Sequence, residues 1–261
     1  MHRRTFMGAL GGVGMLTSTG SASPAAGEKR TRFYLVEKFD LKQGDQPSRL
    51  DEFFSKLLLP VLNKVHSGPK IYLDAQIAPH MPQKIAIYGF ESLQHLQDVH
   101  TKMMENKEFA RAAEEFEKGI EQSAEQQTNI LLEAADYSPE IEVPKEPRKT
   151  GRLFELRVYH SPTYRQLKAL HERFAGSEIR IFHRVGVHPI LYSSTIIGPA
   201  MPNLVYLIPF ENLAEREKAW AAFGADPEWQ KVRKESVAQY GQISQIINIS
   251  LYRATAYSPV K

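Results

Sequence analysis

The sequence repeats itself at a constant offset of 120 residues, and this repeat constrains the fold more than any other feature. The tetrapeptide FESL at 90–93 corresponds to FENL at 210–213, and the tripeptide YSP recurs at 137–139 and 257–259. Matches at this offset continue without a gap through predicted strands, loops and helices. We therefore interpret the chain as two copies of one domain.

The copies are separated by a short charged segment. We place the first copy at residues 31–139 and the second at 151–259. The intervening sequence EIEVPKEPRKT, residues 140–150, contains two prolines and is typical of an exposed linker.

Each copy predicts the order strand, helix, strand, strand, helix, strand. In the second copy RLFELRVYH alternates in side-chain character with a period of two, which indicates a strand at 152–160. The other elements follow in chain order: a helix from about Thr163, strands at 190–197 and 203–210, a helix at 211–223, a shorter helix at 226–232 and a strand at 246–257. In the first copy, Pro60 is expected to kink the first helix or to end its first part.

This order is the ferredoxin-like, or split β-α-β, unit, whose helices cover one face of an antiparallel sheet. The other face must be buried, and the sheet of the second copy can bury it. We predict an α+β fold in which two ferredoxin-like repeats pack sheet to sheet as an intrachain pseudo-dimeric α+β barrel. Glu37 and Arg157 occupy equivalent positions on the first strands, so one hypothesis places them face to face near the pseudo-twofold axis. The alternative is that each is solvated or has another partner.

The N-terminal residues 1–26 predict a signal peptide. Arg3 and Arg4 are followed by Phe6, a weakly apolar glycine-rich run and then small residues. The pattern resembles a twin-arginine export signal, with cleavage expected between Ala22 and Ala26. The expectation is an exported protein, periplasmic or extracellular, that folds before it crosses the membrane. The apolar run is too short to remain as a membrane span, and a disordered basic tail is the alternative interpretation.

Composition excludes several function classes. Removing residues 1–26 leaves 31 basic against 30 acidic residues, a net charge of +1, which argues against nucleic acid as a partner. The chain contains no cysteine, so disulfides, iron–sulfur clusters, thiolate metal sites and a cysteine nucleophile are excluded.

The second copy resembles the NIPSNAP family of the dimeric α+β barrel superfamily. The resemblance rests on ELRVY at 155–159, FENLAERE at 210–217 and DPEWQ at 226–230, and it covers residues 151–259. The first copy is looser, because NKEFA at 106–110 replaces DPEWQ and YLVEKF at 34–39 replaces ELRVY. The resemblance implies the fold and a tendency to form homo-oligomers, but it supplies no set of catalytic residues.

Several residues of these motifs have structural explanations. Asp226 and Pro227 are typical of a helix start, with Asp226 as N-cap and Trp229 anchoring the helix on the core. Arg216 is interpreted as a helix-surface partner of Glu211 rather than as an anion site. Glu155 and Arg157 are the charged residues of ELRVY.

The tyrosines of the second copy's strands are a further set: Tyr159, Tyr192 and Tyr206. They are expected to pack as β-favoured aromatics and to leave their hydroxyls solvated or hydrogen-bonded.

Histidines are the other candidates for chemistry. His183 and His188 are five residues apart, which does not match the spacing of a two-histidine metal site on a helix, and no metal is predicted. For His183 the favoured interpretation is interaction with a helix C-terminus, and the alternative is a place at the mouth of a pocket between helices and sheet. A Ser–His–Asp triad cannot be inferred without a GxSxG motif.

Two function classes remain open. In the first, an apolar pocket between sheet and helices binds a small hydrophobic ligand, or the domain packs against a partner. In the second, the protein is an enzyme of a type found on this superfold: a cofactor-independent monooxygenase, a haem-handling enzyme or an isomerase or cyclase. The candidates for acid–base catalysis are then His183, His188, Tyr159 and Tyr206. No nucleotide-cofactor motif occurs and no cofactor is predicted, while the fold analogy leaves haem and flavin open.

Overall fold

The computed structural model describes residues 30–117, 122–146 and 148–261. The predicted signal peptide, residues 1–26, lies outside the described residues. Within the described part of the chain, every helix is too short or too polar to cross a membrane.

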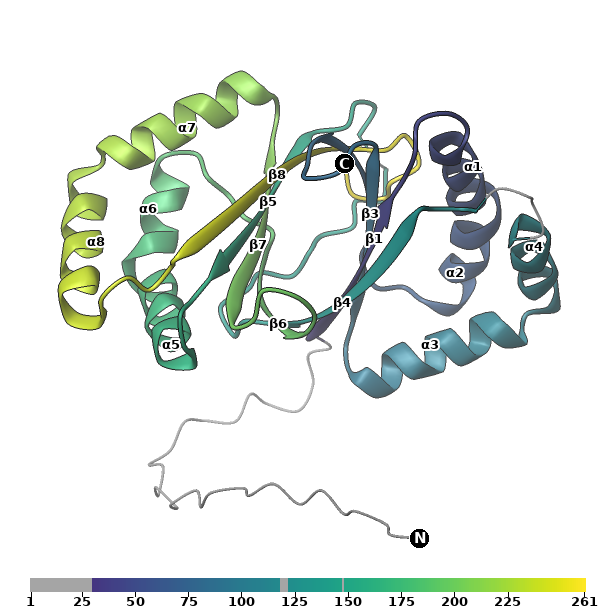
Figure 1. Cartoon of the computed structure of the whole chain (residues 1–261), viewed down its shortest axis with the longest axis horizontal. Coiled ribbons are helices and arrows are strands. Elements are labelled where there is room, and N and C mark those ends of the chain that lie inside the picture. The colour runs from purple at the N-terminus through teal and green to yellow at the C-terminus, as the bar shows by residue number, and fades with distance from the viewer. Residues whose placement is uncertain (1–29, 118–121, 147) are drawn as a thin grey trace, which may run out of the picture.

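The first repeat, called repeat 1, has the predicted order of elements. Its helices lie on the outer side of its sheet, at one end of the molecule (Figure 1). The elements are β1 (Phe33–Asp40), α1 (Gln46–Glu52), η1 (Phe53–Leu58), α2 (Leu59–Val65), β2 (Lys70–Ile77), β3 (Gln83–Phe90), α3 (Leu93–Glu105), α4 (Lys107–Glu117) and β4 (Gln126–Ala134).

The second repeat, called repeat 2, has the same order and lies at the opposite end of the molecule (Figure 1). Its elements are β5 (Leu153–His160), α5 (Tyr164–Arg173), η2 (Phe174–Glu178), α6 (Ile179–Arg184), β6 (Leu191–Ile197), β7 (Asn203–Phe210), α7 (Leu213–Ala225), α8 (Pro227–Tyr240) and β8 (Ile246–Ala254). The helix expected to be shorter, α8, continues to Tyr240 and has 14 residues against 13 in α7.

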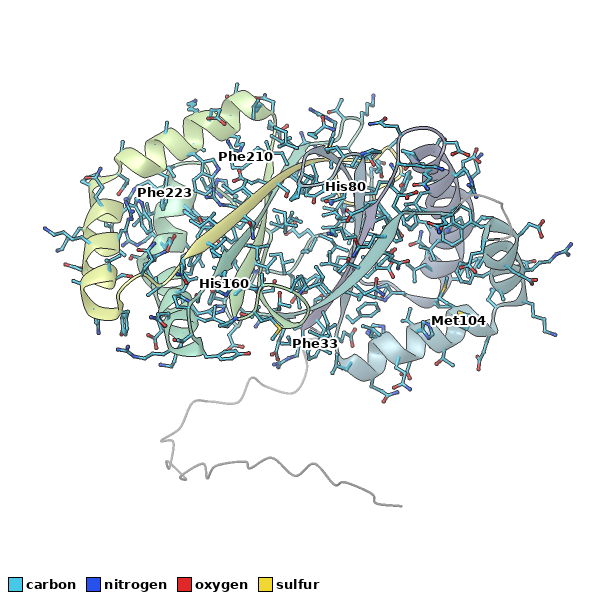
Figure 2. All side chains as sticks on the ribbon, viewed as in Figure 1. Phe33, His80, Met104, His160, Phe210 and Phe223 are labelled. Carbon is cyan, nitrogen blue, oxygen red and sulfur yellow. The ribbon has the colours of Figure 1, made fainter. Side chains whose placement is uncertain are left out.

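The two sheets form one closed barrel with the strand order β1-β3-β2-β8-β5-β7-β6-β4. The predicted pseudo-dimeric barrel is therefore confirmed, and the sheets also join at their edges. Strand β2 pairs antiparallel with β8, and β4 pairs antiparallel with β6, so each repeat covers the edges of the other. Apolar side chains fill the barrel, including Val36, Phe154 and Leu207 (Figure 2 shows all side chains).

The two YSP segments connect the repeats, because the serine of each segment accepts a hydrogen bond from the backbone of the other repeat. After β4, Ser138 Oγ accepts a hydrogen bond of 3.0 Å from the backbone N–H of Tyr192 in repeat 2. After β8, Ser258 Oγ accepts one of 3.0 Å from the backbone N–H of Tyr72 in repeat 1. The repeated tripeptide is thus a latch through which the end of each copy binds the other copy.

The segment after each latch also contributes to the barrel core. Ile141 and Val260 are both buried there, with exposed fractions of 7% and 3%. The linker was expected to be exposed throughout, and Ile141 is the exception because it covers apolar side chains at the barrel end.

The first helix of each repeat contains a π-helical segment, η1 or η2. Pro60 lies in the first turn of α2, directly after η1, so the first part of the helix ends before it as expected. Proline is not the sole cause of the irregularity, because η2 has the same form and the corresponding position 180 holds arginine. Extra residues in a π turn change which side chains of a helix face the sheet. In repeat 2, this segment ends at Glu178, which faces the interior.

Candidate functional site

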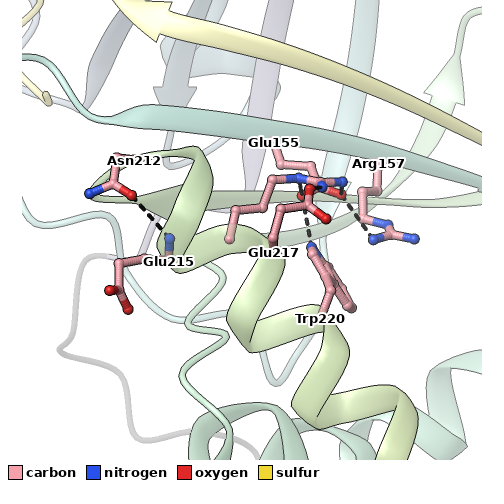
Figure 3. A network of polar contacts seen from close by, with 7 residues as sticks. Glu155, Arg157, Asn212, Glu215, Glu217 and Trp220 are labelled. Carbon is pink, nitrogen blue, oxygen red and sulfur yellow. Dashed lines mark hydrogen bonds and ion pairs between the residues drawn. The ribbon is translucent and has the colours of Figure 1, made fainter.

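The side chains between the sheet and the helices of repeat 2 form a buried polar network. Alternate residues of β5 point toward the helices, so Glu155 and Arg157 lie on the same side while Leu156 faces the barrel. Figure 3 shows Glu155 between Arg157 and Trp220. This group, consisting of Glu155, Arg157, Arg216 and Trp220, is called the Glu155 network.

Glu155 is completely buried and accepts hydrogen bonds from three side chains. Arg157 Nη1 donates at 2.9 Å, Arg216 Nε at 2.7 Å and Trp220 Nε1 at 2.9 Å. The Arg157 guanidinium also lies 4.1 Å from the centre of the Trp220 ring, a distance suited to a cation–π interaction. Arg216 also pairs with the exposed carboxylate of Glu217, so Glu155 is the buried anion that Arg157 and Arg216 share.

The expected partner of Arg216 was wrong. Arg216 binds the buried Glu155, while Glu211 forms an exposed pair with Arg148 at 2.6 Å. Glu211 precedes the N-cap Asn212 and lies outside α7, so the two residues do not share the helix surface on which the pairing was expected.

The expected pairing of Glu37 with Arg157 was also wrong. Each residue faces the helices of its own repeat, on opposite outer sides of the barrel. Arg157 contacts Tyr159, Tyr206 and Trp220 of repeat 2. Burial against the helices of repeat 1 raises the pKa of Glu37 to about 7.

The strand tyrosines pack as predicted, but two of their hydroxyls differ from the expectation. Tyr206 and Tyr159 have ring centres 5.2 Å apart, and Tyr192 stacks on Tyr206 at 5.9 Å. The hydroxyls of Tyr192 and Tyr206 are buried and have no hydrogen-bond partner among the described residues. They are thus neither solvated nor bonded, because the aromatic cluster encloses them.

A second ion pair lies deeper in the same layer. Arg173 Nε donates to Glu178 Oε2 at 2.7 Å, and Glu178 is only 2% exposed. Burial raises the pKa of Glu178 to about 7, although Arg173 and Arg157 favour its charged form. A carboxyl group with this pKa exchanges a proton near neutral pH.

A cavity of about 200 Å³ lies beside this pair, and we call it the repeat 2 chamber. Tyr159, Arg173, Glu178 and Trp229 are among its lining residues, and Ser244 forms another part of the wall. Ser244 Oγ is buried and has no hydrogen-bond partner among the described residues. The chamber therefore combines an aromatic wall with the buried carboxyl group of Glu178 and a serine whose hydroxyl has no partner among the described residues.

The start of α8 positions Trp229 in this wall. Asp226 Oδ1 accepts a hydrogen bond of 3.0 Å from the backbone N–H of Trp229, and Pro227 is the first helical residue. The Trp229 ring packs on Phe223 with a centroid distance of 4.4 Å. The sequence prediction of a capped, tryptophan-anchored helix agrees with this geometry, and the anchor is at the same time part of the chamber.

The structure places His183 and His188 away from the chamber. Both are exposed, and their rings stack on each other with centres 5.1 Å apart. His183 lies in the last turn of α6, as the helix-terminus interpretation predicted. Burial and the neighbouring His188 lower the pKa of His183. Of the four acid–base candidates, Tyr159 lines the chamber and Tyr206 packs against Tyr159.

The apolar pocket was expected between sheet and helices, but a cavity with a more apolar lining than the repeat 2 chamber lies inside the barrel. It has a volume of about 220 Å³, and Val36, Leu156 and Val205 contribute to its lining. In repeat 2 the layer between sheet and helices is largely apolar, as expected, but β5 and η2 also direct Glu155, Arg157 and Glu178 into it.

Sequence reasoning missed Arg173 and Glu178. A signal was present in the repeat itself, since the corresponding positions of the first copy hold Phe53 and Leu58. Charged residues at positions that are apolar in the other copy indicate a polar interior.

Comparisons with known proteins agree with this architecture. The sequence model of the NIPSNAP family matches residues 34–139 and 154–259. No curated protein matches the chain. The structure of an anthrone oxidase-like protein is similar over 87% of this chain and 92% of its own, with a TM-score of 0.54 and 14% identity, which shows a shared fold.

Two structures from the matched family cover a smaller share of the chain. A NIPSNAP-like domain protein from Burkholderia xenovorans is 25% identical over 40% of this chain and 84% of its own, with a TM-score of 0.34. A NIPSNAP family protein from Agrobacterium tumefaciens str. C58 is 14% identical over 45% of this chain and 97% of its own, with a TM-score of 0.37.

Proposed function

Because the chain belongs to the NIPSNAP family and carries a polar chamber in repeat 2, we propose that this chamber binds a small aromatic molecule. The observation that carries the proposal is the position of Glu178, which is buried beside the cavity and has a pKa of about 7. A carboxyl group near half-ionisation can donate a hydrogen bond to a ligand or accept a proton from it.

The size of the chamber supports a ligand of about one ring. An apolar cavity of about 150 Å³ is large enough to hold benzene, and the repeat 2 chamber measures about 200 Å³. It is smaller than the roughly 300–1,000 Å³ of pockets for drug-sized ligands. The repeat 2 chamber is therefore too small for a haem or a flavin.

The lining determines the chemistry of the ligand. Trp229 and Phe223 offer ring faces, whereas Glu178 and the Ser244 hydroxyl offer hydrogen bonds on another side of the cavity. A monocyclic phenol combines these features, because its ring packs on aromatic side chains and its hydroxyl both donates and accepts.

The first test is binding to the purified protein. Native mass spectrometry would identify small molecules that copurify, and isothermal titration with phenol and 4-methylphenol would measure affinity. The variant Val237→Trp places a bulky ring at the chamber wall and is expected to weaken binding at least about tenfold, since the site would be filled. The matched control is Glu117→Trp, which changes the equivalent, exposed position of repeat 1 and should leave the affinity unchanged. Equal affinities in both variants would place the ligand elsewhere.

A second candidate function is proton-transfer catalysis on the bound ligand. Glu178 favours it because a general base is most effective when its pKa lies near the working pH. Tyr159 lines the same cavity and would orient the ligand. NMR can follow the exchange of carbon-bound protons of the ligand for deuterium from the solvent. The variant Glu178→Gln should slow this exchange by roughly 100-fold or more while binding persists. Exchange at the wild-type rate in this variant would leave only the binding function.

We also propose that the protein is exported by the twin-arginine route. The support is the order Arg3, Arg4, Phe6 and a weakly apolar run. Cell fractionation tests the proposal: replacing Arg3 and Arg4 by lysine should retain the protein in the cytoplasm, whereas the single change His2→Ala should not.

Formation of homo-oligomers remains a prediction from the family resemblance. Light scattering coupled to size-exclusion chromatography would report the mass in solution, and a mass of one chain across the accessible concentration range would refute it.

A further inference from the structure

A second polar cluster lies outside the repeat 2 chamber, where the end of repeat 1 crosses repeat 2. An open groove of about 770 Å³ runs along this crossing, and Tyr137, His171 and Ser194 line it. These residues come from the first YSP latch, from α5 and from β6, so only the folded chain brings them together. We call this feature the seam groove.

The three side chains form a continuous hydrogen-bonded row. Ser194 Oγ lies 2.8 Å from His171 Nε2, and Tyr137 Oη lies 2.7 Å from His171 Nδ1. Both ring nitrogens of the histidine are therefore engaged, one by a potential nucleophile and the other by a group that fixes the ring. A nucleophile, a base and an orienting partner within hydrogen-bond reach are the parts of a nucleophilic catalytic site.

We propose that Ser194 and His171 form a catalytic pair that hydrolyses small esters in the seam groove, with Tyr137 as the positioning residue. His171 Nε2 takes the proton of Ser194 Oγ as this oxygen attacks the ester carbonyl carbon. The alcohol leaves with that proton as the ester C–O bond breaks, and an acyl group remains on Ser194. Water then attacks the acyl group, gives its proton to His171 and releases the acid, while Ser194 regains its proton.

The surroundings of His171 suit this role. Burial lowers the pKa of His171, so the imidazole is neutral near pH 7. Burial also raises the pKa of Tyr137, which keeps the hydroxyl protonated. In the tautomer with hydrogen on Nδ1, His171 donates to Tyr137 Oη and leaves Nε2 free to accept the Ser194 proton.

The other seam of the molecule shows that the latch does not require this arrangement. There, Tyr257 Oη donates to Asp51 Oδ1 at 2.7 Å, and Lys84 Nζ also binds Asp51 at 2.8 Å. A carboxylate and an ammonium thus hold the equivalent tyrosine. The latch therefore forms without a histidine–serine pair, and the pair in the seam groove is not explained by the latch.

The groove lining indicates which esters would enter. Glu133, Asp136 and Glu172 contribute carboxylates, and Arg32 is the only lysine or arginine among the residues that line the groove in the described structure. Glu133 pairs with Arg32 and Glu172 pairs with Lys168, so Asp136 gives the lining a weakly negative character that favours neutral or cationic esters over anionic ones. Among 4-nitrophenyl esters, one with a trimethylammonium group should therefore react faster than one with a carboxylate.

The test is covalent labelling of the full chain by a small alkyl fluorophosphonate, which reacts with activated serines. Intact mass and peptide mapping should place one adduct on Ser194, and 4-nitrophenyl acetate should give an acyl adduct at the same residue. A wild-type protein that forms no adduct at Ser194 overturns the proposal.

Variants then separate catalysis from structure. Ser194→Ala should abolish the adduct, and His171→Gln should slow labelling by roughly 100-fold or more. Tyr137→Phe should slow it roughly tenfold because the ring loses its orienting partner. The matched control Tyr257→Phe removes the equivalent hydroxyl at the other seam and should leave labelling unchanged, with thermal melting reporting that each variant is folded. Equal labelling rates for Tyr137→Phe and wild type would contradict the positioning role.

Discussion

The layers between sheet and helices differ sharply in chemistry between the two repeats. Four positions of repeat 2 carry polar or amphipathic side chains: Tyr159, Arg173, Glu178 and Trp229. The same four positions of repeat 1, at an offset of 120 residues, are apolar: Phe39, Phe53, Leu58 and Phe109. In repeat 1 the rings pack directly on one another, as Phe53 and Phe116 do with a centroid distance of 4.5 Å.

This difference indicates which features the fold requires. At these four positions repeat 1 builds the same sheet and helices from apolar packing, so the Arg173–Glu178 pair is not needed for the architecture, although repeat 1 buries Lys84 against Asp51 and Asp74 elsewhere. Burying ionic groups costs desolvation energy that their mutual attraction only partly offsets. The buried Arg173–Glu178 pair and the Glu155 network of repeat 2 therefore point to a role in binding or catalysis.

The largest effect is expected from Glu155→Gln. Glutamine keeps the shape of the side chain but removes the charge that compensates Arg157 and Arg216. Leaving Arg157 buried without its ion-pair partner should lower the free energy of unfolding by about 3–5 kcal/mol, while Arg216 retains Glu217. Urea denaturation measures the loss. The matched control Glu211→Gln breaks an exposed pair with Arg148 and should cost about 0–1 kcal/mol. Similar small losses in both variants would refute the strong coupling in the Glu155 network.

The next effect concerns pH and compares one buried carboxyl group in each repeat. Burial raises the pKa of Glu178 and of Glu37 from 4.5 to about 7. Between these values the folded state holds a proton that the unfolded state has released. Each group therefore lowers the free energy of unfolding as pH rises from 4.5 to about 7, by up to about 3 kcal/mol.

The variants Glu178→Gln and Glu37→Gln lack this titration. Relative to wild type, each should gain stability as pH rises through the window, as measured by urea denaturation at several pH values. A gain in Glu37→Gln alone would mean that Arg173 keeps Glu178 ionised, and the repeat 2 chamber would then lack a neutral carboxyl group.

A smaller change in stability is expected when repeat 2 is given the side chains of repeat 1. The double variant Arg173→Phe and Glu178→Leu replaces the buried pair with the residues found at positions 53 and 58. Replacing a buried ion pair by apolar residues of similar volume is often neutral or stabilising, here by about 1–2 kcal/mol. Ligand binding should be lost, as measured by titration with phenol. Retained binding would separate the ligand site from the repeat 2 chamber.

The features that could be predicted from sequence are those with local signals. The 120-residue offset predicted the two copies, and the alternation of side chains predicted strands of the barrel. The Asp226–Pro227 pair predicted the start of a helix. Contacts between distant segments could not be predicted. Arg216 was matched to the nearby Glu211, whereas its partner Glu155 lies 61 residues away. The seam groove likewise depends on contacts of the first YSP segment with α5 and β6, which no hydrophobic pattern in the sequence predicts.

The smallest effects are expected at the two latches, where the repeats behave alike. Ser138→Ala and Ser258→Ala each leave a buried strand N–H, of Tyr192 or Tyr72, without its acceptor. Each should cost about 1 kcal/mol in urea denaturation, whereas the exposed Ser48→Ala should cost nearly nothing. Ser258 Oγ also donates to the Val260 carbonyl at 2.7 Å, whereas Ser138 Oγ donates to the Pro139 carbonyl at 3.4 Å, so the Ser258 variant should be the more costly of the pair. A loss of unfolding free energy in only one of the two variants would mean that the two hydrogen bonds, although alike in geometry, differ in their contribution to stability. The contrast between the repeats would then include the latches that connect them.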